Sequence, residues 1–128
     1  MDYLLLIGRI LFVGIFFISA PGNFKREKAE GAAANGVPFA SLLVPLGAII
    51  SVIGALSILL GIEARYGAGL IIIFLLPVTF TMHRFWTIDD AMKRRAQYLN
   101  FMKNLSIMGG AFFIAAYGSG ALSLDALW

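Results

Sequence analysis

The sequence predicts an all-α integral membrane protein: a four-helix bundle with short surface helices in its first and third loops. Hydrophobic residues make up 60% of the 128 positions and charged residues only 13%. A soluble domain of this size could not cover so much apolar surface with polar groups. Four apolar segments have roughly the 20 residues that cross a bilayer core of about 30 Å. Because the connections are short, we expect a single domain over residues 1–128.

The predicted spans cover residues 3–20, 37–62, 66–82 and 105–124. The first contains one charge, Arg9. We expect it to be retained rather than cleaved as a signal peptide, because Asp2 replaces a basic leader and Pro21 follows the apolar run. The second and fourth spans carry no charge, and the third contains Pro77. Trp128, beyond the fourth span, fits an aromatic belt at the membrane interface.

The first and third connections are predicted to form helices on the membrane surface. In the first, Asn23 is placed to cap a basic helix that ends at Asn35 and Gly36. In the third, Thr87 and Asp90 have capping-box spacing. An apolar stripe recurs there every three or four residues: Phe85, Ile88, Met92, Ala96, Leu99 and Met102. An apolar stripe opposed by a basic face suits the headgroup level, and we expect this helix to run into the fourth span. The alternative is a partner-facing helix in water.

The distribution of basic residues predicts the orientation. The first and third connections, which share one side of the membrane, hold eight of the ten Lys and Arg residues. The positive-inside rule therefore predicts a multi-pass protein of the inner (plasma) membrane with both termini on the outer side. Topology explains the formal charge of +3, and we expect no nucleic-acid partner.

Several catalytic classes are excluded by residue content. The chain has no cysteine and one histidine, which rules out disulfides, iron-sulfur clusters and a bis-histidine haem site. No phosphate-binding glycine loop, nucleophile triad or metal-ligand spacing is present. We therefore predict no metal site, no catalytic residue and no enzymatic activity of the chain on its own. Partners are expected to be the bilayer and other membrane proteins or further copies of the chain.

Small residues predict where the helices approach closely. In the second span they fall near one face: Gly47, Ser51, Gly54 and Gly61. The fourth span offers Gly109 and Gly110, followed by Gly118 and Gly120. We expect these glycines to serve packing rather than ligand contact.

Short pieces of the chain occur in an order that resembles the DoxX family of four-span membrane proteins. The matching pieces are Arg9 with the run from Ile10 to Phe16, Gly36-Val37-Pro38, Gly54 to Gly61 with Arg65, His83, Phe101 to Leu105, Gly109-Gly110, Gly118-Ser119-Gly120 and Ser123-Leu124-Asp125. The chain departs from the family at Ser51, where many members carry an acidic residue. The resemblance implies an accessory subunit of a quinone-linked membrane redox system, with quinone as its cofactor.

Arg9 and a cluster around His83 are the candidate cofactor-binding residues. Arg9 lies about 9 Å inside its span at 1.5 Å per residue. Either it extends to the outer interface or pairs there with Glu63 or Asp125, which we favour, or it lines a polar site for an anionic or carbonyl-bearing ligand.

At the cytoplasmic end of the third span, His83 and Arg84 could donate hydrogen bonds to a quinone or a lipid, and Trp86 could stack on its ring. The alternative is that they are ordinary features of a membrane boundary.

Two functions from different classes follow. The first is the quinone-linked accessory subunit. The second is an assembly factor or chaperone-like membrane protein that packs against other transmembrane helices.

Overall fold

The computed structural model describes every residue except Met1, Ala121 and Trp128, so the predicted belt residue Trp128 lies outside the described residues. All regular elements in the described part are helical. The α-helices are α1 (Asp2–Ser19), α2 (Arg26–Ala34), α3 (Ala40–Leu60), α4 (Ala64–Met82) and α5 (Ala91–Tyr117). Short 3₁₀ helices cover Ala20–Phe24, Phe85–Thr87 and Leu124–Leu127. Helices α1, α3, α4 and α5 contain stretches that are long and apolar enough to cross a membrane, which confirms the predicted fold class.

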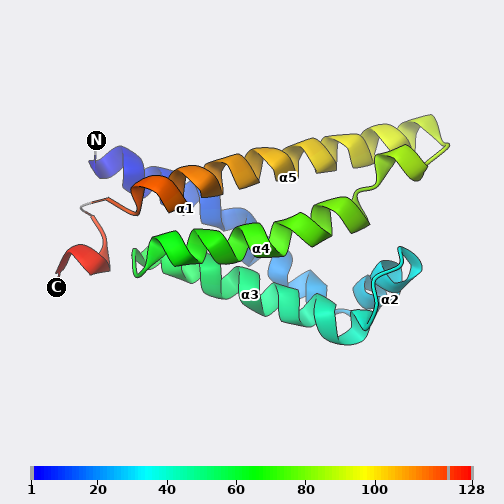
Figure 1. The fold of residues 1–128 in the computed structure, drawn as a ribbon, viewed down its shortest axis with the longest axis horizontal. Coiled ribbons are helices and arrows are strands. Elements are labelled where there is room, and N and C mark those ends of the chain that lie inside the picture. Colours follow the sequence, from blue (N-terminus) through cyan, green and yellow to red (C-terminus); the bar gives the residue numbers. More distant parts are fainter. Residues whose placement is uncertain (1, 121, 128) are drawn as a thin grey trace.

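The four long helices run up and down along one axis, and α2 lies across one end of α3 (Figure 1). Helix α4 packs against both α3 and α5, and α1 lies against α3. Both termini lie at the end of the bundle opposite α2 (Figure 1). The core holds apolar residues from all four long helices: Val13, Phe16, Ala55, Ile58, Ala64, Ala68, Ile71, Leu75, Met108 and Ala111.

The helix boundaries correct part of the predicted capping. Asn23 does not cap the first surface helix, because it belongs to a 3₁₀ helix, and α2 begins only after Lys25. Asn35 is the C-cap of α2, as expected. In the third connection Asp90 is itself the N-cap of α5, and its Oδ2 accepts a hydrogen bond from the Lys93 amide at 2.9 Å. A cap at this position satisfies an amide that the first helical turn leaves free.

Helix α5 joins the amphipathic third connection to the fourth apolar segment without a break, as expected (Figure 1). Residues 91–104 therefore continue the spanning helix along the bundle, and the separate short surface helix predicted for the third connection is wrong. It ends at Tyr117, because Gly118 takes a φ of 79°. Gly120 follows with a φ of 84°. Side chains are strongly disfavoured in this left-handed region, so the two glycines allow the chain to turn back toward the bundle.

The closest helix crossing joins α3 and α4. A Cβ atom on Gly54 would lie 2.7 Å from the Gly67 carbonyl oxygen, and one on Gly67 would lie 2.5 Å from the Ser57 hydroxyl. Neither position can hold a larger residue without moving the backbones apart. The predicted packing role of Gly54 is confirmed, and its partner Gly67 was not predicted. The packing role predicted for Gly109 is wrong, because a Cβ atom there would meet no described atom within 4 Å.

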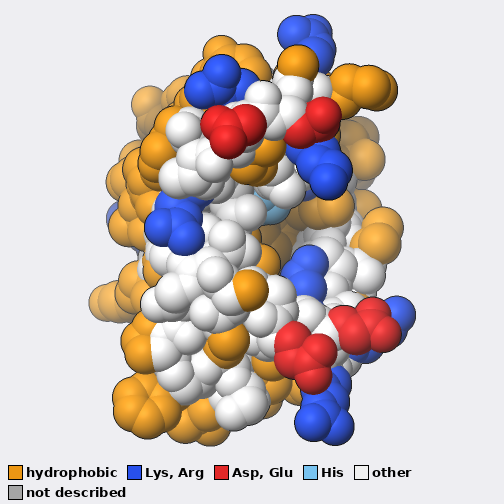
Figure 2. All heavy atoms as spheres, turned by 90° about the vertical axis from the view of Figure 1, so that its right-hand side faces the viewer, with side chains coloured by type: hydrophobic (Ala, Val, Ile, Leu, Met, Phe, Trp, Pro, Cys, Tyr) orange, Lys and Arg blue, Asp and Glu red, His pale blue; other side chains and the backbone are white. Residues whose placement is uncertain are grey.

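The surface divides into an apolar belt and a charged end. Large apolar side chains on all four long helices are exposed, as lipid contact requires. Figure 2 shows the opposite character at the α2 end, where basic and acidic side chains gather in two groups separated by a hollow.

Candidate functional site

Arg9 is buried at the terminus-bearing end of the bundle. It shares the inward face of α1 with Val13 and Phe16 and is only 4% exposed. Its Nε donates to the Ile58 carbonyl at 2.9 Å and its Nη2 to the Leu59 carbonyl at 2.8 Å. Its Nη1 donates to the Ser119 carbonyl at 2.8 Å and to the Leu122 carbonyl at 2.6 Å. We call this group of five residues the Arg9 junction.

The acceptors in the Arg9 junction are carbonyls at the ends of two helices. Ile58 and Leu59 lie in the last turn of α3, beyond the regular helical hydrogen bonds. The Ile58 carbonyl also accepts from the Gly61 amide at 3.2 Å, so Arg9 is a second donor to it. The negative end of the α3 dipole also favours a cation at this point. Ser119 and Leu122 follow α5, in the segment that turns back through Gly118 and Gly120.

The expected ion pair of Arg9 with Glu63 or Asp125 is wrong. The partners of Arg9 are backbone carbonyls. The Asp125 carboxylate instead accepts a hydrogen bond from the Glu63 amide at 2.6 Å, at the start of α4. Four of the five guanidinium N–H groups are engaged, so Arg9 has little capacity left for a ligand.

His83 and Arg84 lie at the other end of the bundle and connect neighbouring elements. His83 Nδ1 lies 2.7 Å from the Gln97 Oε1 atom, which joins the end of α4 to α5. Arg84 Nη2 donates to the Asn35 carbonyl at 2.5 Å, which joins the same segment to the end of α2.

Trp86 is 47% exposed and packs edge-to-face on Phe85 and Phe101, with ring centroids 5.2 Å and 5.7 Å away. The structure thus brings His83, Arg84 and Trp86 together but places Arg9 at the opposite end. The four candidate residues do not form one site.

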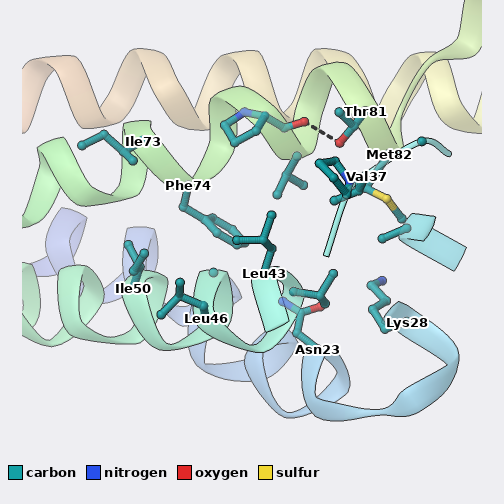
Figure 3. A pocket seen from close by; sticks show the side chains of 17 residues that line it. Asn23, Lys28, Val37, Leu43, Leu46, Ile50, Ile73, Phe74, Thr81 and Met82 are labelled. Atoms are coloured by element: carbon teal, nitrogen blue, oxygen red, sulfur yellow. Dashed lines mark hydrogen bonds between the residues drawn. The ribbon is translucent and has the colours of Figure 1, made fainter. Parts of the chain in front are cut away.

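A cavity of about 420 Å³ opens between α3 and α4 beside α2. Ile50, Ile73 and Phe74 line its inner part, and Asn23 and Lys28 lie at its outer part (Figure 3). The size falls in the range of small-molecule sites. The sequence analysis did not predict this cavity, because its walls come from three separated segments of ordinary apolar residues. Two prolines that line the cavity were the available signal: Pro38 precedes α3, and Pro77 lies inside α4.

The fold and the site together define a small four-span membrane protein that satisfies its buried charge internally and holds an apolar cavity at its charged end. The chain belongs to the SURF4 family, whose model matches residues 1–127. No solved structure matches the chain.

Two bacterial relatives match over most of their length. The inner membrane protein YphA of Escherichia coli is 35% identical over 127 residues, which cover 95% of this chain and 88% of the relative. The inner membrane protein YqjF of the same organism is 31% identical over 128 residues, covering 98% of this chain and 92% of the relative.

Eukaryotic relatives are longer. The Surfeit locus protein 4 homolog of Schizosaccharomyces pombe is 27% identical over 124 residues, which cover 96% of this chain but only 37% of that protein. The ER-derived vesicles protein ERV29 of Saccharomyces cerevisiae is 25% identical over 77 residues, or 60% of this chain and 24% of that protein.

The family assignment corrects the resemblance to DoxX. The chain belongs to the SURF4 family, and two of its relatives are a Surfeit locus protein 4 homolog and ERV29. The interpretation as a quinone-linked oxidoreductase subunit is therefore wrong. The pieces that suggested it, such as an arginine in the first span and glycines in the others, meet general needs of helix packing in lipid.

Replacement of Arg9 tests the Arg9 junction. Arg9→Leu leaves its carbonyl acceptors without their donor and should lower the free energy of unfolding by about 3 kcal/mol or more. Arg9→Lys should recover only part of this, because one ammonium lacks the planar fork that reaches carbonyls of two segments. Denaturant unfolding in detergent measures both.

Glu63→Gln is the control for an ion pair. We expect this substitution to leave the free energy of unfolding nearly unchanged, and its effect to add to that of Arg9→Lys. A coupling above about 0.5 kcal/mol between the two changes would contradict the carbonyl-bonded arrangement.

A double-mutant cycle tests the link between His83 and Gln97. His83→Ala and Gln97→Ala should each destabilise by about 1 kcal/mol, and the double variant should cost less than their sum, because one hydrogen bond is lost in all three. Met92→Ala, at an exposed position of α5, serves as the control. Additive losses in thermal unfolding would show that the two side chains do not interact.

Proposed function

We propose that the chain is a non-catalytic protein of the inner membrane that binds other membrane-inserted polypeptides through its spanning helices and assists their assembly or transport. The main support is the outward placement of Gly8 on α1 and Gly109 on α5. Among the described residues, a Cβ atom at either glycine would meet no atom within 4 Å. Within that part of the chain these glycines therefore have no close packing partner, unlike Gly54.

Both glycines lie among large exposed apolar residues. Leu4 and Leu11 flank Gly8 on α1, with 68% and 75% of their surface exposed. Phe112 and Phe113 follow Gly109 on α5 and are 61% and 70% exposed. In lipid, association of helices depends on close van der Waals approach, which a glycine between larger residues permits. The two faces thus suit a helix of a partner protein or of a second copy.

Two polar side chains that were candidates for chemistry are hydrogen-bonded within the chain, which favours binding over catalysis. Arg9 donates to four carbonyls, and His83 is bonded to Gln97. The cavity lining described above contains no histidine or carboxylate. The yeast relative ERV29, named as a protein of ER-derived vesicles, supports a role alongside other membrane proteins.

Photo-crosslinking in native membranes tests this proposal. A photoreactive residue at Leu11 or Phe112, about one turn from the open glycines, should give discrete polypeptide adducts, whose masses identify a client or a second copy. The same residue at Ile53, an exposed position of α3, should give lipid adducts only. Gly8→Leu or Gly109→Leu should lower the adduct yield at the neighbouring position without lowering the melting temperature. Lipid adducts alone at all three positions would refute the proposal.

We also propose that the α2 end faces the cytoplasm and both termini face outward. Eight of the ten Lys and Arg residues lie in the segments of this end, and the positive-inside rule favours its retention in the cytoplasm. The bacterial relatives YphA and YqjF are named as inner membrane proteins, which supports the same membrane for this chain.

A single cysteine tests the orientation, since the chain has none of its own. Met92→Cys, at a residue 84% exposed near the start of α5, should react with a membrane-impermeant maleimide only after cells are opened. Asp2→Cys, at the terminus-bearing end, should react in intact cells. The reverse pattern would place the basic end outside.

A further inference from the structure

The cavity beside α2 changes character along its length. Ile50 lies ten residues beyond Ala40, the first residue of α3, which is about 15 Å at 1.5 Å per residue. Around Ile50, Ile73 and Phe74 the wall is entirely apolar (Figure 3). At the other end lie Lys28 and Asn23, contributed by α2 and the segment before it. The cavity therefore follows the span direction from the membrane interior to the charged end.

At the mouth of the cavity, the end beside α2, Lys28 and Asn23 supply the polar groups that a ligand could contact. Thr81 also lines the cavity, but its hydroxyl donates to the Pro77 carbonyl at 2.6 Å within α4. Lys28 is exposed, and its stem allows the ammonium to reach the opening.

The end of the bundle that contains the mouth is basic as a whole. The segments of this end carry eight Lys and Arg residues against four acidic residues, Glu27, Glu30, Asp89 and Asp90, a net excess of four positive charges. The charged groups frame the hollow in Figure 2. Such an excess attracts anionic headgroups at the membrane surface.

The shape of the cavity favours a narrow apolar occupant. It follows the span direction between α3 and α4, whereas a partner helix is a rigid cylinder about 10–12 Å across. An acyl chain is narrow and can follow the apolar wall inward. Its headgroup would then lie at the level of Lys28.

We propose that this cavity is a binding site for an anionic phospholipid, with one acyl chain between α3 and α4 and the phosphate against Lys28. The lipid would fill the gap between α2, α3 and α4 at the end of the bundle that has no counterpart of the Arg9 junction. Lys28 supplies the preference for a negative headgroup, and the apolar wall around Ile50 supplies most of the buried area.

Native mass spectrometry of the full chain in detergent tests the site with phosphatidylglycerol and phosphatidylcholine of identical acyl chains. The wild type should hold one phosphatidylglycerol in preference to phosphatidylcholine by at least about fivefold. Ile50→Trp, which fills the inner part, should reduce both lipid adducts to the nonspecific level seen with an unrelated membrane protein in the same detergent. Lys28→Gln should keep binding but abolish the preference.

Matched controls separate the site from general effects. Ile53→Trp, on the same helix but outside the cavity lining, and Lys25→Gln, on the same segment as Lys28 but outside the lining, should both behave as the wild type. If Ile50→Trp lowers the melting temperature, Val44→Phe, at another lining position, replaces it.

Three results would overturn the proposal: equal binding of the two lipids by the wild type, undiminished binding in the filled variants, or a photoreactive residue at Ile50 that gives polypeptide adducts instead of lipid adducts. The outcome does not depend on the partner faces around Gly8 and Gly109, since none of the substitutions lies on those faces.

Discussion

A guanidinium inside a hydrophobic span must find partners, because an unpaired arginine near the middle of a bilayer costs about 2.5–3.5 kcal/mol on insertion scales. Arg9 meets this constraint with backbone carbonyls of two separate segments, the end of α3 and the stretch after α5. The carbonyls at the end of α3 lie beyond the regular helical hydrogen bonds, and Arg9 supplies them with a donor. The Arg9 guanidinium therefore fixes three parts of the chain to one another. Asp125 extends the connection, since its amide donates to the Gly61 carbonyl at 3.0 Å and its carboxylate accepts from the Glu63 amide.

The opposite end of the bundle is stabilised by other contacts, so the two ends of the molecule differ in structure. Single hydrogen bonds from His83 to Gln97 and from Arg84 to the Asn35 carbonyl connect α4, α5 and α2. They bridge the ends of helices without filling the space between α3 and α4, and the apolar cavity remains there. The terminus-bearing end is thus closed by a buried cation, while the basic end contains the cavity. The close contact of Gly54 with Gly67 lies in the half nearer the terminus-bearing end, because Gly67 is in the first turn of α4.

Much of the fold could be predicted because length and hydrophobicity directly reflect the bilayer. The long helices and the continuity of α5 with its amphipathic start follow from patterns along the chain. The partners of Arg9 could not be predicted, because a backbone carbonyl is present at every residue and the sequence does not mark which ones lack a donor. The cavity could not be predicted either, because its walls come from segments that are far apart in the sequence. Short glycine and arginine patterns led to the wrong family, since unrelated bundles in lipid need similar small residues.

Hydrogen–deuterium exchange in lipid nanodiscs tests most directly whether Arg9 holds the segment after α5 against the end of α3. The amide of Asp125, bonded to the Gly61 carbonyl, reports on this contact from outside the Arg9 junction. The account predicts that Arg9→Lys raises its exchange rate by at least about tenfold, equivalent to about 1.4 kcal/mol, while the Lys93 amide at the far end of the bundle exchanges as in the wild type. An unchanged rate at Asp125 in a folded Arg9→Lys protein would contradict it.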